Sequence, residues 1–292
     1  MLVDYSLVTT KLHKVFKTYP WCRGFNVTDF DGTINTKPWL LRLLLALSDE
    51  HQEKRIYTND LKDAIHSYST RGSTSFAEVM NEALRATPLV FTGLHEHSVK
   101  QIAQDLVDRH AREVYSFPVA LIESLDARTE PLWRPMVAIT GSPQMIAEIF
   151  ASRIKGIRFV IGAKYYKDRR GFYTGERDEN PAVLKNLVME SLLDKLRHES
   201  KGSFAVVDSH ADLSLVPYVE VVFFINPSAE LTDDLRYLKG KKVIIIRESN
   251  KSGVHAYQMS RQGREQEKTV SQILPSDMVK TFPKLRGLLF CA

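Results

Sequence analysis

Residues 24–33 read GFNVTDFDGT, and this stretch decides how the rest of the chain is interpreted. Residues 24–28 form a short strand-like run, and an acidic turn that contains Asp29 and Asp31 follows it. Gly32 lets the backbone turn, so two carboxylates at positions i and i+2 can both face one pocket. One of them can attack phosphorus while the other protonates the leaving oxygen and later activates water. The alternative is an acidic turn in which Asp31 or Thr33 merely caps a helix.

Downstream of this turn the chain takes on a helical pattern. Leu40, Leu43, Leu44 and Leu47 recur at the spacing of one helix face, and turn-forming residues predict loops at 71–75 and 88–93. The pattern has little strand character before residue 112. We therefore predict a helical insertion over residues 35–111, set into a core domain made of residues 1–34 and 112–292.

After the insertion, short apolar strands alternate with helices. Helices are predicted at 118–125, 144–153 and 181–197, and strands at 136–139, 158–161, 204–207, 221–225 and 242–246. This alternation is typical of a parallel sheet that helices cover on both faces, so the predicted fold class is α/β. The region after Glu248 is polar and gives a weak signal.

A second acidic pair follows the predicted strand at 204–207. Asp208 and Asp212 are spaced i and i+4, and carboxylates at such a junction suit a hard cation such as Mg²⁺. Taken alone, the pair is at least as well explained as a helix cap. Its position after a strand of the same alternating series favours the metal-binding interpretation, because ligand sites of open parallel sheets lie at the carboxyl ends of strands.

Two further segments complete the candidate site. Thr140, Gly141 and Ser142 follow the strand at 136–139, and hydroxyl and N–H groups before a helix form a natural phosphate site. An ordinary helix cap is about equally good as an explanation of that segment. Lys185 lies inside the predicted helix from residue 181, where a lysine is usually a solvated surface charge.

The composition limits the classes of protein to which this chain can belong. Of 292 residues, 43% are hydrophobic and 26% charged, which is ordinary globular usage, and the net charge of +5 is mild. Cys22 and Cys291 cannot build a disulfide framework, so we expect a reducing, cytoplasmic setting. The first ten residues lack the pattern of a signal peptide, and no stretch is long and apolar enough for a transmembrane segment.

The histidines and the basic stretches of the sequence are weaker signals with simpler explanations. His95, His97 and His110 fit no strong zinc spacing and are read as surface histidines. Basic residues in the insertion, Arg71 among them, can read an anionic substrate but more often form solvated faces. The basic stretch 236–247 raises a rival reading as a nucleic-acid-binding protein, but no aromatic stacking pattern accompanies it, so no nucleic-acid partner is expected.

In their order along the chain, the four polar segments resemble the motifs of the haloacid dehalogenase (HAD) superfamily of phosphohydrolases. The helical insertion between the first two motifs is similar to the cap of its phosphoserine-phosphatase-like subfamily. The resemblance implies a Rossmann-like three-layer core, Mg²⁺ as cofactor and a small phosphorylated substrate. It also implies a role for each site residue. Asp29 would be the nucleophile and Asp31 the general acid and base, while Thr140 and Lys185 would contact the phosphoryl group. The residues implied in substrate or phosphate binding are Gly32, Thr33, Gly141, Ser142 and Arg71, and those implied around the metal are Asp29, Asp208, Asp212 and the Asp31 backbone carbonyl.

Two departures from the family pattern bear on this reading. Val207 stands where the family usually has glycine before the first acid of its last motif. Residues 35–38 offer no acid like the glutamate with which phosphoserine phosphatases read the substrate amine, so specificity for phosphoserine is doubtful. A phosphotransferase with the same intermediate, or a catalytically silent protein with the same fold, are the alternatives.

Overall fold

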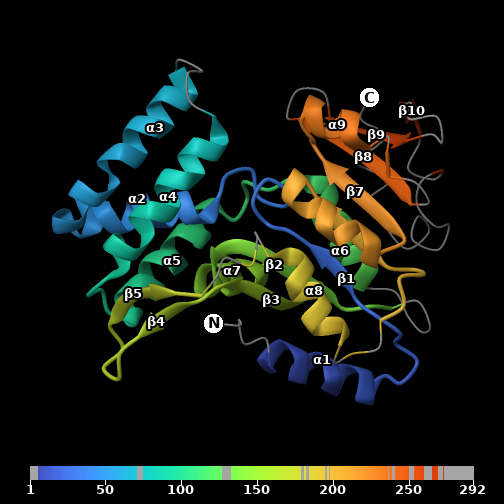
Figure 1. Cartoon of the computed structure of the whole chain (residues 1–292), viewed down its shortest axis with the longest axis horizontal. Coiled ribbons are helices and arrows are strands. Elements are labelled where there is room, and N and C mark those ends of the chain that lie inside the picture. Colours follow the sequence, from blue (N-terminus) through green and yellow to red (C-terminus); the bar gives the residue numbers. More distant parts are fainter. Residues whose placement is uncertain are drawn as a thin grey trace.

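We describe the protein from a computed structural model (Figure 1). The description covers residues 6–70, 75–126, 133–178, 181, 184–194, 196, 198–235, 237–238, 241–249, 253–259, 265–268 and 272. The elements in chain order are α1 (Ser6–Thr18), β1 (Asn26–Thr28), α2 (Trp39–Glu50), η1 (Gln52–Thr58), α3 (Asn59–Thr70), α4 (Phe76–Phe91), α5 (Glu96–His110), α6 (Ser116–Asp126), β2 (Met136–Pro143), α7 (Gln144–Ala151), β3 (Ile157–Ala163), β4 (Tyr165–Lys167), β5 (Tyr173–Arg177), α8 (Lys185–Leu193), β6 (Phe204–Val207), η2 (His210–Tyr218), β7 (Val221–Ile225), α9 (Ala229–Leu235), β8 (Lys242–Ser249), β9 (Gly253–Met259) and β10 (Glu265–Glu267).

One sheet organises the core, with the strand order β10-β9-β8-β7-β6-β1-β2-β3. The strands from β8 to β3 are parallel to their neighbours, while β9 and β10 pair antiparallel. β1 lies between β2 and β6, with Val27 opposite both Val137 and Ala205. Because parallel strands end at the same edge of a sheet, the residues that follow β1, β2 and β6 come together there.

Alternating apolar residues bury both faces of the sheet. Val206 and Ile244 belong to one hydrophobic cluster, which also contains buried residues of α6 and α7. Their neighbours Val207 and Ile245 belong to a second cluster, together with buried residues of α1, α8 and α9. Helices therefore cover both faces, and the prediction of a three-layer α/β fold with a parallel sheet is confirmed.

The segment between β1 and β2 is helical, and its helices α2 to α5 lie beside the sheet in Figure 1. The leucines of α2 at the predicted spacing are all buried, and they share a cluster with Val79 and Val90 of α4. The loop predicted at 88–93 begins later than expected, because α4 continues through Pro88 to Phe91. The missing N–H of Pro88 does not end the helix, and the N–H of Thr92 still reaches the Pro88 carbonyl (3.0 Å).

A hairpin of β4 and β5 leaves the core after β3 and joins this helical segment. The N–H of Gly93 donates to the Tyr173 carbonyl and the N–H of Tyr173 to the Leu94 carbonyl, both at 2.9 Å. Lys167 pairs with Glu96 at 2.6 Å. The loop between α4 and α5 is therefore bonded to the β4–β5 hairpin, in addition to the chain connections before α2 and after α5. The sequence pattern did not predict this hairpin.

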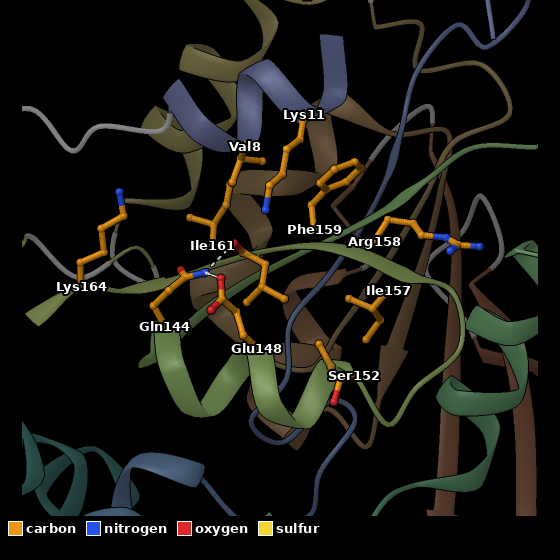
Figure 2. Close-up of a pocket in the computed structure, with 12 residues that line it drawn as sticks. Val8, Lys11, Gln144, Glu148, Ser152, Ile157, Arg158, Phe159, Ile161 and Lys164 are labelled. Carbon is orange, nitrogen blue, oxygen red and sulfur yellow. Dashed lines mark hydrogen bonds between the residues drawn. The ribbon is translucent and has the colours of Figure 1, made fainter. Parts of the chain in front are cut away.

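The outer edge of the sheet at β3 is partly covered by one side chain. Gln144 lies at the start of α7 (Figure 2) and donates to the Val160 carbonyl at 3.0 Å. It also accepts from the N–H of Gly162 at 2.6 Å. These are groups that a further strand would otherwise pair with, so the amide of Gln144 blunts this edge.

Two predicted boundaries differ from the structure. The helix expected from residue 181 begins at Lys185, which makes this lysine its first helical residue. The region after Glu248 contributes β9 and β10 to the sheet, although it gave only a weak signal in the sequence. Among the helices of the described residues, none is long and apolar enough to cross a membrane.

Candidate active site

The strand order brings the polar segments to one place. Asp29 follows β1, Thr140 lies within the last half of β2, and Asp208 follows β6. The N–H of Asp29 donates to the Val206 carbonyl at 3.1 Å, which joins the ends of β1 and β6. Segments that lie up to 183 positions apart, from residue 29 to residue 212, therefore converge at the carboxyl edge of the sheet.

Lys185 is the centre of this cluster. Its side chain is 1% exposed, and its Nζ lies 3.1 Å from Asp29 Oδ2 and also bonds to Asp212 Oδ1. Burial alone would lower the pKa of Lys185, but the charges of Asp212 and Asp29 outweigh burial and raise it. The lysine is therefore a buried cation between two carboxylates, and the alternative of a solvated surface lysine is wrong.

Asp212 is held by its own turn as well as by the lysine. Its Oδ2 accepts hydrogen bonds from the N–H of Ser209 at 3.0 Å and from Ser209 Oγ at 2.7 Å. This is the capping geometry that the sequence left open as an alternative for the second acidic pair. Capping and membership of the acidic cluster are compatible, because Asp212 uses a different oxygen for each contact.

Asp208 faces the turn that follows β1. Its Oδ1 accepts from Thr33 Oγ1 at 2.5 Å. Gly32 has a φ of +86°, and a Cβ atom at this position would lie 2.3 Å from Asp208 Oδ2. Glycine is thus required here both by its backbone conformation and by the close approach of the carboxylate. The hydroxyl of Thr33, predicted to bind substrate phosphate, is used to orient Asp208.

The side chain of Asp31 does not belong to the group formed by Asp29, Asp208 and Asp212. Its Oδ1 accepts from Asn35 Nδ2 at 2.9 Å and from the N–H of Trp39 at 3.1 Å. Its Oδ2 accepts from Ser142 Oγ at 2.6 Å. The carboxylate is therefore oriented by both the connection into α2 and the end of β2, and the hydroxyl of Ser142 contacts Asp31.

The remaining candidates lie as follows. Thr140 is fully buried, and its Oγ1 accepts from the N–H of Ser142 at 3.2 Å. Gly141 lies between them and is partly exposed. Arg71 lies outside the described residues.

No protein-family profile and no curated protein matches the chain. Among solved structures, it is similar to a protein of unknown function from Bordetella pertussis Tohama I, with 18% identity and a TM-score of 0.56 over 76% of this chain and 98% of that one. It is also similar to a phospho-aspartyl intermediate analogue of phosphoserine phosphatase (10% identity, TM-score 0.46, 76% and 92% covered) and to a probable phosphoserine phosphatase from Vibrio cholerae (11%, 0.47, 75% and 64%).

The likeness to the Bordetella pertussis protein covers nearly all of that protein and shows a shared fold. At these identities the likeness concerns the fold alone, so the chemistry of this chain rests on its own residues. The parallel sheet and the convergence of the motifs at one edge agree with the three-layer core that the resemblance in the sequence implied.

The residues of this site fit a divalent cation. Oxygens of Asp29, Asp208 and Asp212 all lie within 4.8 Å of one another, and the donors are hard carboxylate oxygens. Three carboxylates against the single ammonium of Lys185 leave a surplus of two negative charges. Among the described residues, this is the one group of three acidic, histidine or cysteine side chains close enough to share an ion, and His95, His97 and His110 join no such group.

The surplus charge shows in the pKa values of the carboxylates. Burial, with the nearby charges of Asp212 and Asp31, raises the pKa of Asp29 to about 7, although Lys185 opposes this. Burial, with Asp212 and Asp29, also raises the pKa of Asp208 well above its ordinary value. Deprotonating both carboxylates without a counter-ion is therefore costly.

This predicts a pH-dependent stability in the absence of metal. The pKa of Asp29 is about 7 in the folded chain against an ordinary value of 3.8, so the folded state binds the proton more tightly. The protonated carboxyl group of Asp29 therefore stabilises the folded state at low pH, and this stabilisation is lost as the pH rises through about 7. In EDTA, we expect the Tm to fall between about pH 5 and pH 8, and to recover at pH 8 when Mg²⁺ is added.

Calorimetry of the wild type and Asp29→Asn would check this. The asparagine variant should show a flatter decline of Tm, because the titrating group is gone. An equal decline in both proteins would contradict the assignment of the effect to Asp29.

Sequence reasoning missed Asn35, the N–H of Trp39 and Ser209 as parts of the site. Ser209 and Asp212 do have the spacing of a capping box, which is a recognisable signal. Asn35 gave no such signal, because its bond to Asp31 depends on the path of the chain between β1 and α2.

Proposed function

We propose that this chain is a magnesium-dependent phosphomonoesterase that works through an aspartyl-phosphate on Asp29. The observation that supports this most is the buried Lys185, which lies against Asp29 and Asp212 beside Asp208. A lysine and three carboxylates gathered in a largely buried cluster are expensive to maintain for structure alone, and chemistry on an anionic substrate explains them.

In the first step, a carboxylate oxygen of Asp29 attacks phosphorus, and the bond between phosphorus and the ester oxygen breaks. Asp31 donates a proton to the departing alcohol oxygen. In the second step, Asp31 takes a proton from water as the water oxygen attacks the same phosphorus. The bond between phosphorus and Asp29 breaks, which releases inorganic phosphate and restores the carboxylate.

The other residues prepare these steps. Asn35, Trp39 and Ser142 hold the carboxylate of Asp31 in place through both of its oxygens. Lys185 offsets negative charge on Asp29 and on the phosphoryl group, and Thr140 with Gly141 lines the phosphate position. Mg²⁺, held by Asp29, Asp208 and the Asp31 carbonyl with Asp212 in support, would neutralise charge on the transferring group.

We further propose the division into a core of residues 1–34 and 112–292 and a cap of residues 35–111. The cap would cover the carboxyl edge of the sheet and keep bulk water from the phosphoryl group. The substrate would be a small phosphorylated metabolite. With Asn35 bonded to Asp31 and no acid in residues 35–38, we do not expect the site to read the amine of phosphoserine.

Phosphate release from a panel of phosphomonoesters tests this proposal. We expect turnover in Mg²⁺ and at least about a hundredfold less in EDTA, restored when Mg²⁺ is added back. Adding alcohols as acceptors distinguishes a phosphotransferase from a phosphatase, because transfer would form a new phosphate ester in place of free phosphate. A folded protein that binds Mg²⁺ but turns over no panel member in either mode would favour the catalytically silent alternative.

A further inference from the structure

Three aromatic rings gather on the surface beyond the end of α1. The ring centroids lie 5.6 Å apart for Tyr19 and Trp21, 5.3 Å for Tyr19 and Trp133, and 6.0 Å for Trp21 and Trp133. Tyr19 is 42% exposed, and both tryptophans are partly exposed. The rings pack on one another but belong to neither of the two hydrophobic clusters of the core. Core packing therefore does not account for them.

The helix that leads to these rings has a basic outer face. Leu12 points into the core and is fully buried, whereas Lys11, Lys14 and Lys17 are exposed. Figure 2 shows Lys11 reaching from α1 into the groove of about 370 Å³ along β3. Within the described part of the chain, no carboxylate forms an ion pair with any of these three lysines.

We propose that the surface formed by Lys14, Lys17, Tyr19, Trp21 and Trp133 docks onto an anionic phospholipid membrane. Lysines near an anionic bilayer are attracted to its surface potential, and tryptophan and tyrosine rings favour the interface between headgroups and acyl chains. A basic helix that leads directly into partly exposed amphipathic rings offers both kinds of attraction next to each other.

The position of this surface suits a peripheral enzyme. Trp21 precedes β1 and Trp133 precedes β2, so the rings lie toward the amino ends of the strands. Asp29 and Thr140 lie toward the carboxyl ends of the same two strands. Docking through the rings leaves the candidate active site open to water-soluble substrates, and the proposal stands whether or not the chain is a phosphatase.

Nucleic acid fits this surface less well. Single-stranded binding sites present ring faces on which bases stack. Here the rings meet one another at interplanar angles of 56° to 71°, so each ring is already packed against its neighbours. A bilayer interface needs no free ring face, because it accepts the rings as a cluster.

Co-sedimentation with vesicles of phosphatidylcholine, with and without phosphatidylserine, tests the proposal. The wild type should bind the phosphatidylserine vesicles, and a Lys14→Glu, Lys17→Glu double variant should bind at least about tenfold more weakly. Lys100→Glu with Arg109→Glu on α5 is the matched control, since it makes the same change in net charge on another face. It should bind within about twofold of the wild type.

Tryptophan fluorescence with brominated lipids supplies the second readout. The chain has three tryptophans, and Trp39 is 1% exposed, so quenching would report on Trp21 and Trp133. We expect quenching in the wild type and less of it in both Trp21→Phe and Trp133→Phe. Absence of vesicle binding, equal losses in the control variant, no quenching on bound vesicles, or tighter binding to DNA at the same salt would each overturn the proposal.

Discussion

Asp29→Asn is expected to lower kcat for phosphomonoester hydrolysis by about 10⁴-fold or more. An amide oxygen is too weak a nucleophile to attack phosphorus, so the first step has no route. The side chain keeps its shape, and the N–H of Phe30, which donates to Asp29 Oδ1 at 2.7 Å, can still bond to an amide oxygen. Phosphate release under saturating substrate and Mg²⁺ measures the effect.

The variant should remain folded, because Lys185 keeps its bond to Asp212 and one surplus negative charge is gone. Asp63→Asn on α3 is the matched control, since Asp63 is exposed and far from the site in sequence. The control should keep wild-type kcat. Retained activity in Asp29→Asn, with a mass spectrum that rules out deamidation back to aspartate, would show that another residue is the nucleophile.

Lys185→Met is expected to be costly for both stability and activity. Without the ammonium, the carboxylates of Asp29, Asp208 and Asp212 lie together uncompensated. Removing one partner from a buried ion pair typically costs about 3–5 kcal/mol, and we expect a loss of this order at about pH 8 in EDTA. The loss should shrink toward about pH 5.5, because Asp29 and Asp208, whose pKa values are raised, take up protons there.

Mg²⁺ should restore much of the stability of Lys185→Met, but kcat should stay about 10³-fold down, since the transferring phosphoryl group has lost a fixed cation. Urea unfolding at both pH values and phosphate release provide the two readouts. Lys100→Met on α5 is the control for removing an exposed lysine. A destabilisation that is independent of pH would mean that packing, and not charge balance, dominates at Lys185.

The parts of the fold that could be predicted from the sequence are those with strong local patterns. The strands that begin at Phe204 and Val221 are buried along their whole length, so their apolar runs are unambiguous. The leucines of α2 have a clear helical period because one face of the helix is buried. The motif residues Asp29 and Asp208 follow such strands, which is why their meeting could be predicted before the strand order was known.

The parts that could not be predicted depend on contacts between distant segments. β4 and β5 are short and largely exposed, they pair with each other, and β5 bonds to the α4–α5 loop through Tyr173. Neither strand has a long apolar alternation that the sequence could show. β9 is partly exposed along most of its length and pairs with β8. The bond from Ser142 to Asp31 joins residues 111 positions apart, and a phosphate-binding segment was the reasonable reading of that hydroxyl.

The central claim is the covalent intermediate on Asp29, and acid-quench trapping tests it most directly. The enzyme in Mg²⁺ would be mixed with a phosphomonoester that it hydrolyses and quenched in acid within the first turnover. Reduction with borohydride would then convert an aspartyl-phosphate to homoserine. The account predicts homoserine at position 29 in the peptide mass spectrum, and none in Asp29→Asn or without substrate. An unmodified Asp29 alongside a full turnover of released phosphate, or homoserine at another aspartate, would contradict it.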